Sequence, residues 1–191
     1  MTDLAGVPSG VHIRQATPGD LLDIVRLLDA ALLTNEPAVV ERRTDAGDVF
    51  VAVRNADVAD FSDSRDSGDG PNGSRSPSTS TSRSAPPNDG AKLGVVVLTR
   101  ADRALHIDAI TTRHSSRGRG IATGLIKRSV SRARDLGYDL LTAQFRPPLR
   151  DFYASRDFTV YHRDGRGRGY RRISGETQSH LPCQSPVNRS K

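Results

Sequence analysis

Two glycines in an arginine-rich turn are the residues of this sequence best suited to binding a ligand. Gly118 and Gly120 follow the strand-like run 105–112 and precede an amphipathic helix. Glycine lets bare backbone N–H groups approach a ligand, and the start of a helix adds unpaired N–H groups and the positive end of its dipole. The pattern predicts a cradle for an anion, most naturally a phosphate, with Arg117 and Arg119 adding charge at its rim.

The spacing of this turn fits neither of two common phosphate-binding loops. The dinucleotide pattern G-x-G-x-x-G fails because Thr123 stands where the third glycine belongs, and the sequence holds no G-x-x-x-x-G-K-[ST] string. Arg117, Gly120 and Ala122 instead form the pattern R-x-x-G-x-A. This pattern resembles the acyl-CoA pyrophosphate signature of the GNAT acetyltransferase superfamily, R/Q-x-x-G-x-G/A. A plain strand–turn–helix connection without a ligand is the alternative interpretation.

A second resemblance to the same family lies in the segment 149–158. It is similar to the late A-x-x-F-Y-E-K-x-G-F segment of the family, with Leu149 in place of the small residue and Asp157 in place of the glycine. Arg146 stands where an asparagine is common. The alignment places Tyr153 on the tyrosine that the family often uses as a general acid. The resemblance implies that Tyr153 protonates the CoA thiolate or holds its sulfur; the alternative is a tyrosine that only fills the core.

The resemblance also implies where acetyl-CoA binds. The amides of an extended pantetheine arm can pair with an exposed strand, which in the family is the fourth strand. The residues implied for cofactor binding are Ile110, Thr111 and Thr112 along the arm, and Arg117, Gly118, Arg119, Gly120, Ile121, Ala122 and Thr123, whose main-chain amides would hold the pyrophosphate. We expect no metal at this site.

Acetyl transfer to an amine needs a neutral nucleophile, and therefore a group that takes up its proton. Asp108 and His106 lie two residues apart on the expected fourth strand, which puts both on one face. The family often has an acidic residue near this point, two residues before Ile110, so Asp108 is the predicted base. His106 is an alternative because its pKa lies near neutrality, and either residue could instead lie on a solvated surface. Gln144 on the fifth strand could bind substrate but cannot act as a base.

The expected elements follow the order β-α-α-β-β-β-α-β-α-β-β. Strands are predicted at 11–16, 49–54, 93–99, 105–112, 139–145, 158–162 and 170–174, and helices at 18–32, 37–43, 121–136 and 147–155. Consecutive strands exclude a purely parallel sheet, whereas the later β-α-β unit requires a parallel pair. The sequence thus predicts an α/β fold of the α+β type, with a mixed, mainly antiparallel sheet and helices on both faces. This arrangement is similar to the GNAT fold, which has its signature between the fourth strand and the third helix.

The chain length of 191 residues favours one domain, which we place at 11–174 between a flexible N-terminus at 1–10 and a flexible C-terminal tail at 175–191. Within the domain, residues 57–90 are almost all Ser, Asp, Gly, Pro, Asn and Thr, which cannot bury enough apolar surface to order the segment. The segment is predicted to be a disordered insertion in a hairpin. A partner-binding or modified loop is the alternative.

Composition narrows the class of protein further. The single cysteine, Cys183, excludes a disulfide framework and a cysteine–histidine zinc site. No apolar run reaches the length of a membrane span, and the N-terminus lacks the features of a secretion signal, so we expect a cytoplasmic protein. The net charge of +6 suits an anionic ligand or partner without identifying it.

The leading hypothesis is an N-acetyltransferase that transfers an acetyl group from acetyl-CoA to a primary amine by direct attack in a ternary complex. A non-catalytic acyl-CoA-binding regulatory module is one alternative. A basic nucleic-acid-binding protein is another, because the Arg/Gly/Tyr run 166–172 resembles an RNA-binding repeat, although a glycine-rich hairpin explains that run equally well. Polyamine, aminoglycoside, amino acid and protein N-terminus all stay open as acceptors, and homodimerisation stays open too. In this fold, residues around 33–41 and the last hairpin form the acceptor site.

Overall fold

The computed structural model describes residues 7–33, 35–55 and 90–173. The predicted insertion, except Gly90, and the predicted C-terminal tail lie outside these residues. The elements run in the order β1 (Val11–Gln15), η1 (Pro18–Asp20), α1 (Leu21–Ala30), α2 (Pro37–Asp45), β2 (Val49–Arg54), β3 (Lys92–Ala101), β4 (Ala104–Thr112), η2 (His114–Ser116), α3 (Ile121–Asp135), β5 (Leu140–Phe145), η3 (Pro147–Leu149), α4 (Arg150–Ala154), β6 (Thr159–Arg163) and β7 (Arg166–Arg172).

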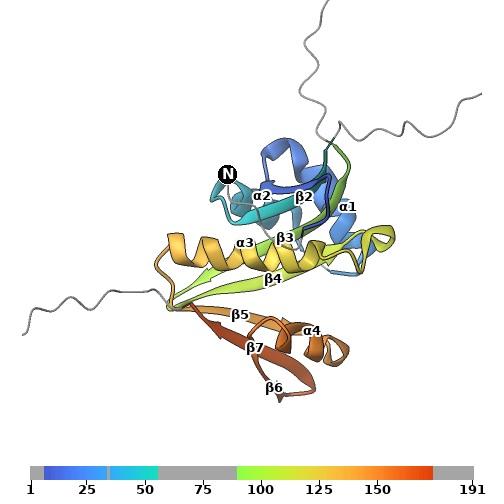
Figure 1. Ribbon diagram of the computed structural model, residues 1–191. Coiled ribbons are helices and arrows are strands. Elements are labelled where there is room, and N and C mark those ends of the chain that lie inside the picture. Colours follow the sequence, from blue (N-terminus) through green and yellow to red (C-terminus); the bar gives the residue numbers. More distant parts are fainter. Residues whose placement is uncertain (1–6, 34, 56–89, 174–191) are drawn as a thin grey trace, which may run out of the picture.

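One sheet organises the described chain (Figure 1). Its seven strands lie in the order β1-β2-β3-β4-β5-β7-β6, and every neighbouring pair is antiparallel except β4 and β5. The predicted fold class and order of elements are therefore confirmed. The parallel pair follows from the long crossover through α3, which returns the chain to the edge of β4 in the same direction.

Two apolar cores cover the two faces of the sheet. On one face, Phe50 and Ala52 of β2 belong to the core that includes α3 and Tyr153 of α4. On the other face, Val51 and Val53 join the core that includes α1 and Val40 of α2. Because both faces are covered, β2 is apolar over nearly its whole length, as expected for a central strand.

The first helix ends earlier than the sequence predicts, and its buried face differs. The leucine pattern predicts a helix through Leu32, but α1 stops at Ala30, and Leu32 has a positive φ of 55° and is 78% exposed. Leu22, near the start of α1, is also exposed, at 61%. The buried side chains are Ile24, Leu27 and Leu28. Leucine spacing alone fits two adjacent helical faces, and packing against the sheet selects one of them.

The last strand begins before the predicted position. The glycine-rich run 164–169 is expected as a connection, yet the turn is confined to Asp164 and Gly165, and β7 starts at Arg166. Glycine is required in this strand because a Cβ at Gly167 would overlap the ring of Phe145. Gly169 packs against the same ring and against Phe158. The packing against these rings explains the glycines of the Arg/Gly run without RNA binding.

Smaller differences concern the ends of elements and the N-terminus. The remaining predicted boundaries lie within about two residues of those observed. The expected flexible N-terminus includes residues 7–10, which contact the domain in the structure. The Val7 side chain lies where a Cβ on Gly124 would sit, and the Asn55 N–H donates to the Gly10 carbonyl at 2.8 Å. In the part of the chain that the structure describes, no helix has both the length and the apolar character to span a bilayer.

Candidate active site

The two parallel strands at the centre of the sheet separate halfway along their length. Their pairing joins 104–107 to 140–143 and ends at Ile107 and Ala143. β4 then continues to Thr112, while β5 stays paired with β7 through Phe145. Figure 1 shows the two halves of the sheet diverging from this shared end. Residues 108–112 of β4 consequently present an edge that is not paired with β5, where an extended ligand can bind as an additional strand.

A bulge in β4 sets the direction of the side chains at the point of separation. Val97 pairs with Ala109 and Leu98 pairs with Ile107, which leaves Asp108 as the extra residue. Ile107 belongs to the core under α3, whereas Ala109 belongs to the core under α1. The extra residue therefore reverses the alternation of β4, as bulges near active sites often do. No pattern in the sequence predicts this bulge, since it depends on the register with β3.

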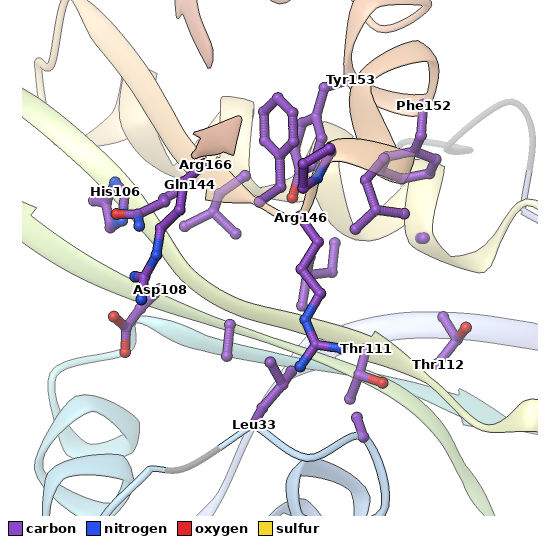
Figure 2. A pocket seen from close by; sticks show the side chains of 18 of the residues that line it. Leu33, His106, Asp108, Thr111, Thr112, Gln144, Arg146, Phe152, Tyr153 and Arg166 are labelled. Atoms are coloured by element: carbon purple, nitrogen blue, oxygen red, sulfur yellow. The ribbon is translucent and has the colours of Figure 1, made fainter. Parts of the chain in front are cut away.

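A cavity of about 860 Å³ occupies the space between the separated strands (Figure 2). The described residues that line it come from the α1–α2 connection, β4, the glycine turn, β5 with the segment after it, and the β6–β7 turn: Ala31, Leu33, His106, Ile107, Asp108, Ala109, Ile110, Thr111, Thr112, Arg117, Gly118, Ala122, Gln144, Phe145, Arg146, Pro147, Leu149, Phe152, Tyr153, Gly165 and Arg166. Both predicted catalytic residues, Asp108 and Tyr153, are among them. His106 and Gln144 also line this cavity.

Six of the ten predicted cofactor-binding residues line the cavity: Ile110, Thr111, Thr112, Arg117, Gly118 and Ala122. The other four, Arg119, Gly120, Ile121 and Thr123, do not. Ile121 is buried in the core under α3, so only its main chain could reach a ligand. The Thr123 hydroxyl accepts hydrogen bonds from Arg156 Nε at 3.1 Å and Nη2 at 2.7 Å.

The glycine turn has the open backbone that the sequence predicts. Gly118 and Gly120 both have positive φ, 75° and 82°, and Gly120 is the N-cap of α3. A Cβ at Gly118 would meet no atom within 4 Å, so the turn is open on that side. One correction is needed: the Arg117 N–H donates to the His114 carbonyl at 3.3 Å. The row of amides suited to an anion therefore begins at Gly118. It continues into the first turn of α3, where the N–H groups have no hydrogen-bond partner within the helix.

Tyr153 combines a packed ring with a hydroxyl at the cavity. Its ring stacks on Phe145 at a centroid distance of 4.3 Å and meets Phe152 and Phe158 edge to face at 5.2 and 5.3 Å. Burial raises the pKa of Tyr153 to about 12, despite the opposing effect of the Arg156 charge. Within the described residues the hydroxyl forms no hydrogen bond, although Tyr153 lines the cavity. Tyr153 is thus a core residue whose polar end is available to a ligand.

His106 and Asp108 lie at the other end of the cavity in Figure 2, near Gln144. Asp108 accepts a hydrogen bond from Arg43 of α2 at 2.5 Å. His106 Nδ1 lies 2.9 Å from the Thr142 hydroxyl oxygen. Burial lowers the pKa of His106, and the charge of Arg43 adds to this effect while Asp108 opposes it. The net effect favours the neutral imidazole.

Two arginines that the sequence did not single out connect parts of this site. Arg43 holds Asp108, and Arg156 joins the end of α4 to the first turn of α3 through Thr123. Arg156 also lies over the Phe152 ring, 3.8 Å from its centroid. A signal for Arg156 was present, because the sequence has a cation within the aromatic segment 149–158. No sequence signal pointed to Arg43, since its partner Asp108 is 65 residues away.

Comparisons with known proteins agree with this architecture. Residues 87–174 match the family model for an acetyltransferase (GNAT) domain, while no curated protein matches the chain. Among similar solved structures, N-acetylglutamate synthase from Neisseria gonorrhoeae, complexed with coenzyme A and N-acetyl-glutamate, has a TM-score of 0.60 and 15% identity over 88% of this chain and 36% of its own. Ard1 from Thermoplasma volcanium has a TM-score of 0.60 and 15% identity over 87% of this chain and 99% of its own.

A Mycobacterium tuberculosis protein solved in complex with CoA has a TM-score of 0.58 and 14% identity over 84% of this chain and 98% of its own. At such identities the likeness concerns the fold, and this chain spans only about a third of the Neisseria enzyme. The family model carries the assignment beyond the fold. Residues 87–174, which include the R-x-x-G-x-A turn and the Phe-Tyr segment, therefore match a GNAT acetyltransferase domain.

Proposed function

We propose that the protein transfers an acetyl group from acetyl-CoA to a primary amine by direct attack in a ternary complex. The observation that carries this proposal is the continuity of the cavity: Gly118 and Ala122 at the start of α3, and Tyr153 and His106 at the diverging strands, line the same space. A turn suited to an anion, an imidazole that can accept a proton and a hydroxyl that can donate a hydrogen bond, all in one cavity, are parts that acetyl transfer requires. Two of the similar structures contain coenzyme A, which supports acetyl-CoA as the donor.

The residues of the cavity fit acetyl-CoA along its length. The diphosphate would accept hydrogen bonds from the main-chain amides of residues 118–123, with Arg117 beside them. The pantetheine arm would lie along the open edge of β4 at 108–112, where its amides can pair with the backbone. Leu149 and Phe152 line the cavity as apolar neighbours for the arm.

His106 is the group we propose as the general base. The sequence favours Asp108, but one oxygen of that carboxylate already accepts the hydrogen bond from Arg43. His106 is neutral because of its burial, and the neutral imidazole is the form that takes up a proton. In this proposal Asp108 attracts the acceptor ammonium and His106 removes its proton. The amine nitrogen then forms a bond to the thioester carbon, the C–S electron pair leaves with the sulfur, and the second proton that the nitrogen loses passes to the departing thiolate or to solvent.

Tyr153 is proposed to stabilise the departing sulfur by a hydrogen bond. Because its pKa is about 12, the phenol stays protonated throughout the neutral range. Complete proton transfer to a thiolate, whose ordinary conjugate pKa is about 8.5, would be uphill. The hydrogen-bonding role is therefore the better of the two that the family resemblance implies.

The pH dependence of kcat/KM tests the choice of base. The neutral form of His106 is active, and burial lowers its pKa below 6.5. We therefore expect the decrease of kcat/KM with falling pH to occur at a more acidic pH than for an ordinary histidine base. His106→Gln should remove this acidic limb together with most of the activity, whereas Asp108→Asn should retain the limb. If Asp108→Asn removes the limb and His106→Gln keeps it, Asp108 is the base.

Binding of acetyl-CoA tests the proposed function itself. Titration calorimetry on the full chain should give a dissociation constant within the range of ordinary substrates, about 1 µM to 1 mM. Gly118→Asp should abolish binding by placing a carboxylate against the diphosphate. Gly137→Asp is a matched control, because Gly137 has a similar φ of 73° and an equally open Cβ position at the far end of α3.

The titration, together with an assay of free-thiol release, separates the alternative functions. Absence of heat at millimolar acetyl-CoA would contradict an acyltransferase and favour the nucleic-acid-binding hypothesis. Binding without thiol release against any amine of a broad panel would favour the regulatory module. Equal binding by the two glycine variants would show that the turn does not hold the diphosphate.

A further inference from the structure

The cavity contains more positive charge than acetyl transfer to a simple amine requires. Arg146 follows β5 and Arg166 begins β7, and both line the cavity with exposed side chains. Figure 2 shows Arg146 extending from the end of β5 toward Thr111, and Arg166 extending toward Asp108. Within the described ranges, neither guanidinium group forms an ion pair or a side-chain hydrogen bond.

The carboxylates of the described residues do not balance this charge. Asp108 is the one carboxylate among the lining residues that the structure describes, and Arg43 already binds it at 2.5 Å. Arg117, the third arginine of the lining, lies at the glycine turn, where the diphosphate of acetyl-CoA would offset its charge. Two guanidinium groups therefore remain in the cavity without a carboxylate partner among the described residues, that of Arg146 toward Thr111 and that of Arg166 toward Asp108.

A further arginine strengthens the positive potential at this end. Arg168 pairs with Gln144 across β5 and β7, and its Nε atom is buried without a hydrogen-bond partner in the described structure. Its charge is also close enough to His106 to disfavour the imidazolium form. Cations clustered in a partly enclosed space attract an anion and repel a second cation.

We propose that the acceptor is a small amine that also carries a carboxylate, as an amino acid does. Arg146 and Arg166 bind the carboxylate, since guanidinium groups match its geometry with paired hydrogen bonds. The amine then points toward His106 and Asp108. The same charges disfavour polyamines and aminoglycosides, which bring further cations into the cavity. This inference rests on the proposed acetyl transfer and deepens it by naming the class of acceptor.

A carboxylate next to an amine could belong to a free amino acid or to the acidic N-terminal segment of a peptide. The chemistry recognised is the same, and the experiment separates the two sources. Release of free thiol from acetyl-CoA is measured on the full chain with the twenty amino acids, their α-carboxamides, peptides beginning with aspartate or glutamate, spermidine and kanamycin. Each carboxamide differs from its acid only in the group that the arginines would bind.

We expect at least one free amino acid to exceed its carboxamide and spermidine by about tenfold or more in kcat/KM, the effect of one charge-assisted contact. Preference for acidic peptides over free amino acids would keep the carboxylate subsite and assign it to a peptide. Equal or better use of the carboxamides or of spermidine would overturn the inference while leaving the proposed function intact. Absence of thiol release with every amine would overturn both.

Variants test the two arginines directly. Arg146→Gln and Arg166→Gln should each raise KM for the acceptor about tenfold without changing KM for acetyl-CoA. Arg163→Gln is the matched control: it makes the same substitution on the same hairpin, at an exposed side chain that pairs with Asp164 and does not line the cavity. Arg166→Lys should restore part of the affinity because it keeps the charge. A rise in KM for acetyl-CoA alone in either Gln variant would overturn the assignment.

Discussion

Replacing Tyr153 by phenylalanine removes one hydroxyl group from the wall of the cavity and leaves the aromatic packing in place. The ring keeps its stack on Phe145 and its edge contacts with Phe152 and Phe158. Within the described structure the hydroxyl forms no hydrogen bond that the fold would lose. We therefore expect the free energy of unfolding of Tyr153→Phe to lie within about 0.5 kcal/mol of the wild type.

The catalytic effect should be much larger than the effect on stability. A hydrogen bond to a charged group contributes about 1.5–3 kcal/mol, and the proposed bond to the departing thiolate forms only as the C–S bond breaks. Its loss should therefore lower kcat by about 10- to 150-fold, with little change in KM for acetyl-CoA. Because the pKa of Tyr153 is about 12, the wild-type rate should show no decrease from its ionisation up to about pH 10.

The assay is release of free thiol from acetyl-CoA at saturating acceptor, with thermal unfolding measured on the same preparations. Tyr161→Phe provides the matched control, because Tyr161 lies on β6 with 47% of its surface exposed and does not line the cavity. A loss of less than about threefold in kcat with unchanged unfolding would refute the role of the Tyr153 hydroxyl. A parallel loss of stability and activity would instead assign Tyr153 to the core alone.

Three further substitutions test the elements that position the site. Gly120→Ala should cost about 1–2 kcal/mol, because φ at this N-cap is 82°, and should raise KM for acetyl-CoA in steady-state kinetics. Gly167→Ala should destabilise by about 1–3 kcal/mol in urea unfolding and lower kcat, because its Cβ would displace the Phe145 ring; an unchanged midpoint would contradict this packing. Asp20→Asn should lower the free energy of unfolding by about 3–5 kcal/mol, because it removes a buried carboxylate that Lys92 contacts at 3.1 Å. A smaller loss in thermal unfolding would contradict the importance of this ion pair.

Most of the fold was predictable from local patterns. The apolar run 49–54 predicts a strand, and the amphipathic pattern after Gly120 predicts a helix. Both patterns are visible in short stretches of sequence, because strand and helix periodicity depends on neighbouring residues. Errors arose where the decisive contact is distant in sequence. The start of β7 was missed because Gly167 looks like a loop residue until the ring of Phe145 is placed over it. Leu32 was assigned to a helix because its spacing alone cannot show that the chain turns away there.

The residues of the candidate site likewise fall into those that local motifs predict and those that depend on tertiary contacts. The glycine turn and the Phe-Tyr segment were recognisable because each is a short motif whose residues act together. Arg43 of α2 binds Asp108 of β4, and the cavity brings Arg146, which follows β5, together with Arg166 of β7. Such pairs depend on how the elements meet.

The sequence by itself determined the order of elements, the position of the glycine turn before α3 and the resemblance to the GNAT family, since all three follow from residues close together in the chain. Only the tertiary structure decided that β4 and β5 separate after Ile107 and that a bulge at Asp108 reverses the side chains of β4. Strand register is set by packing over the whole sheet, and no local propensity records it. The cavity and the charges around it follow from that register.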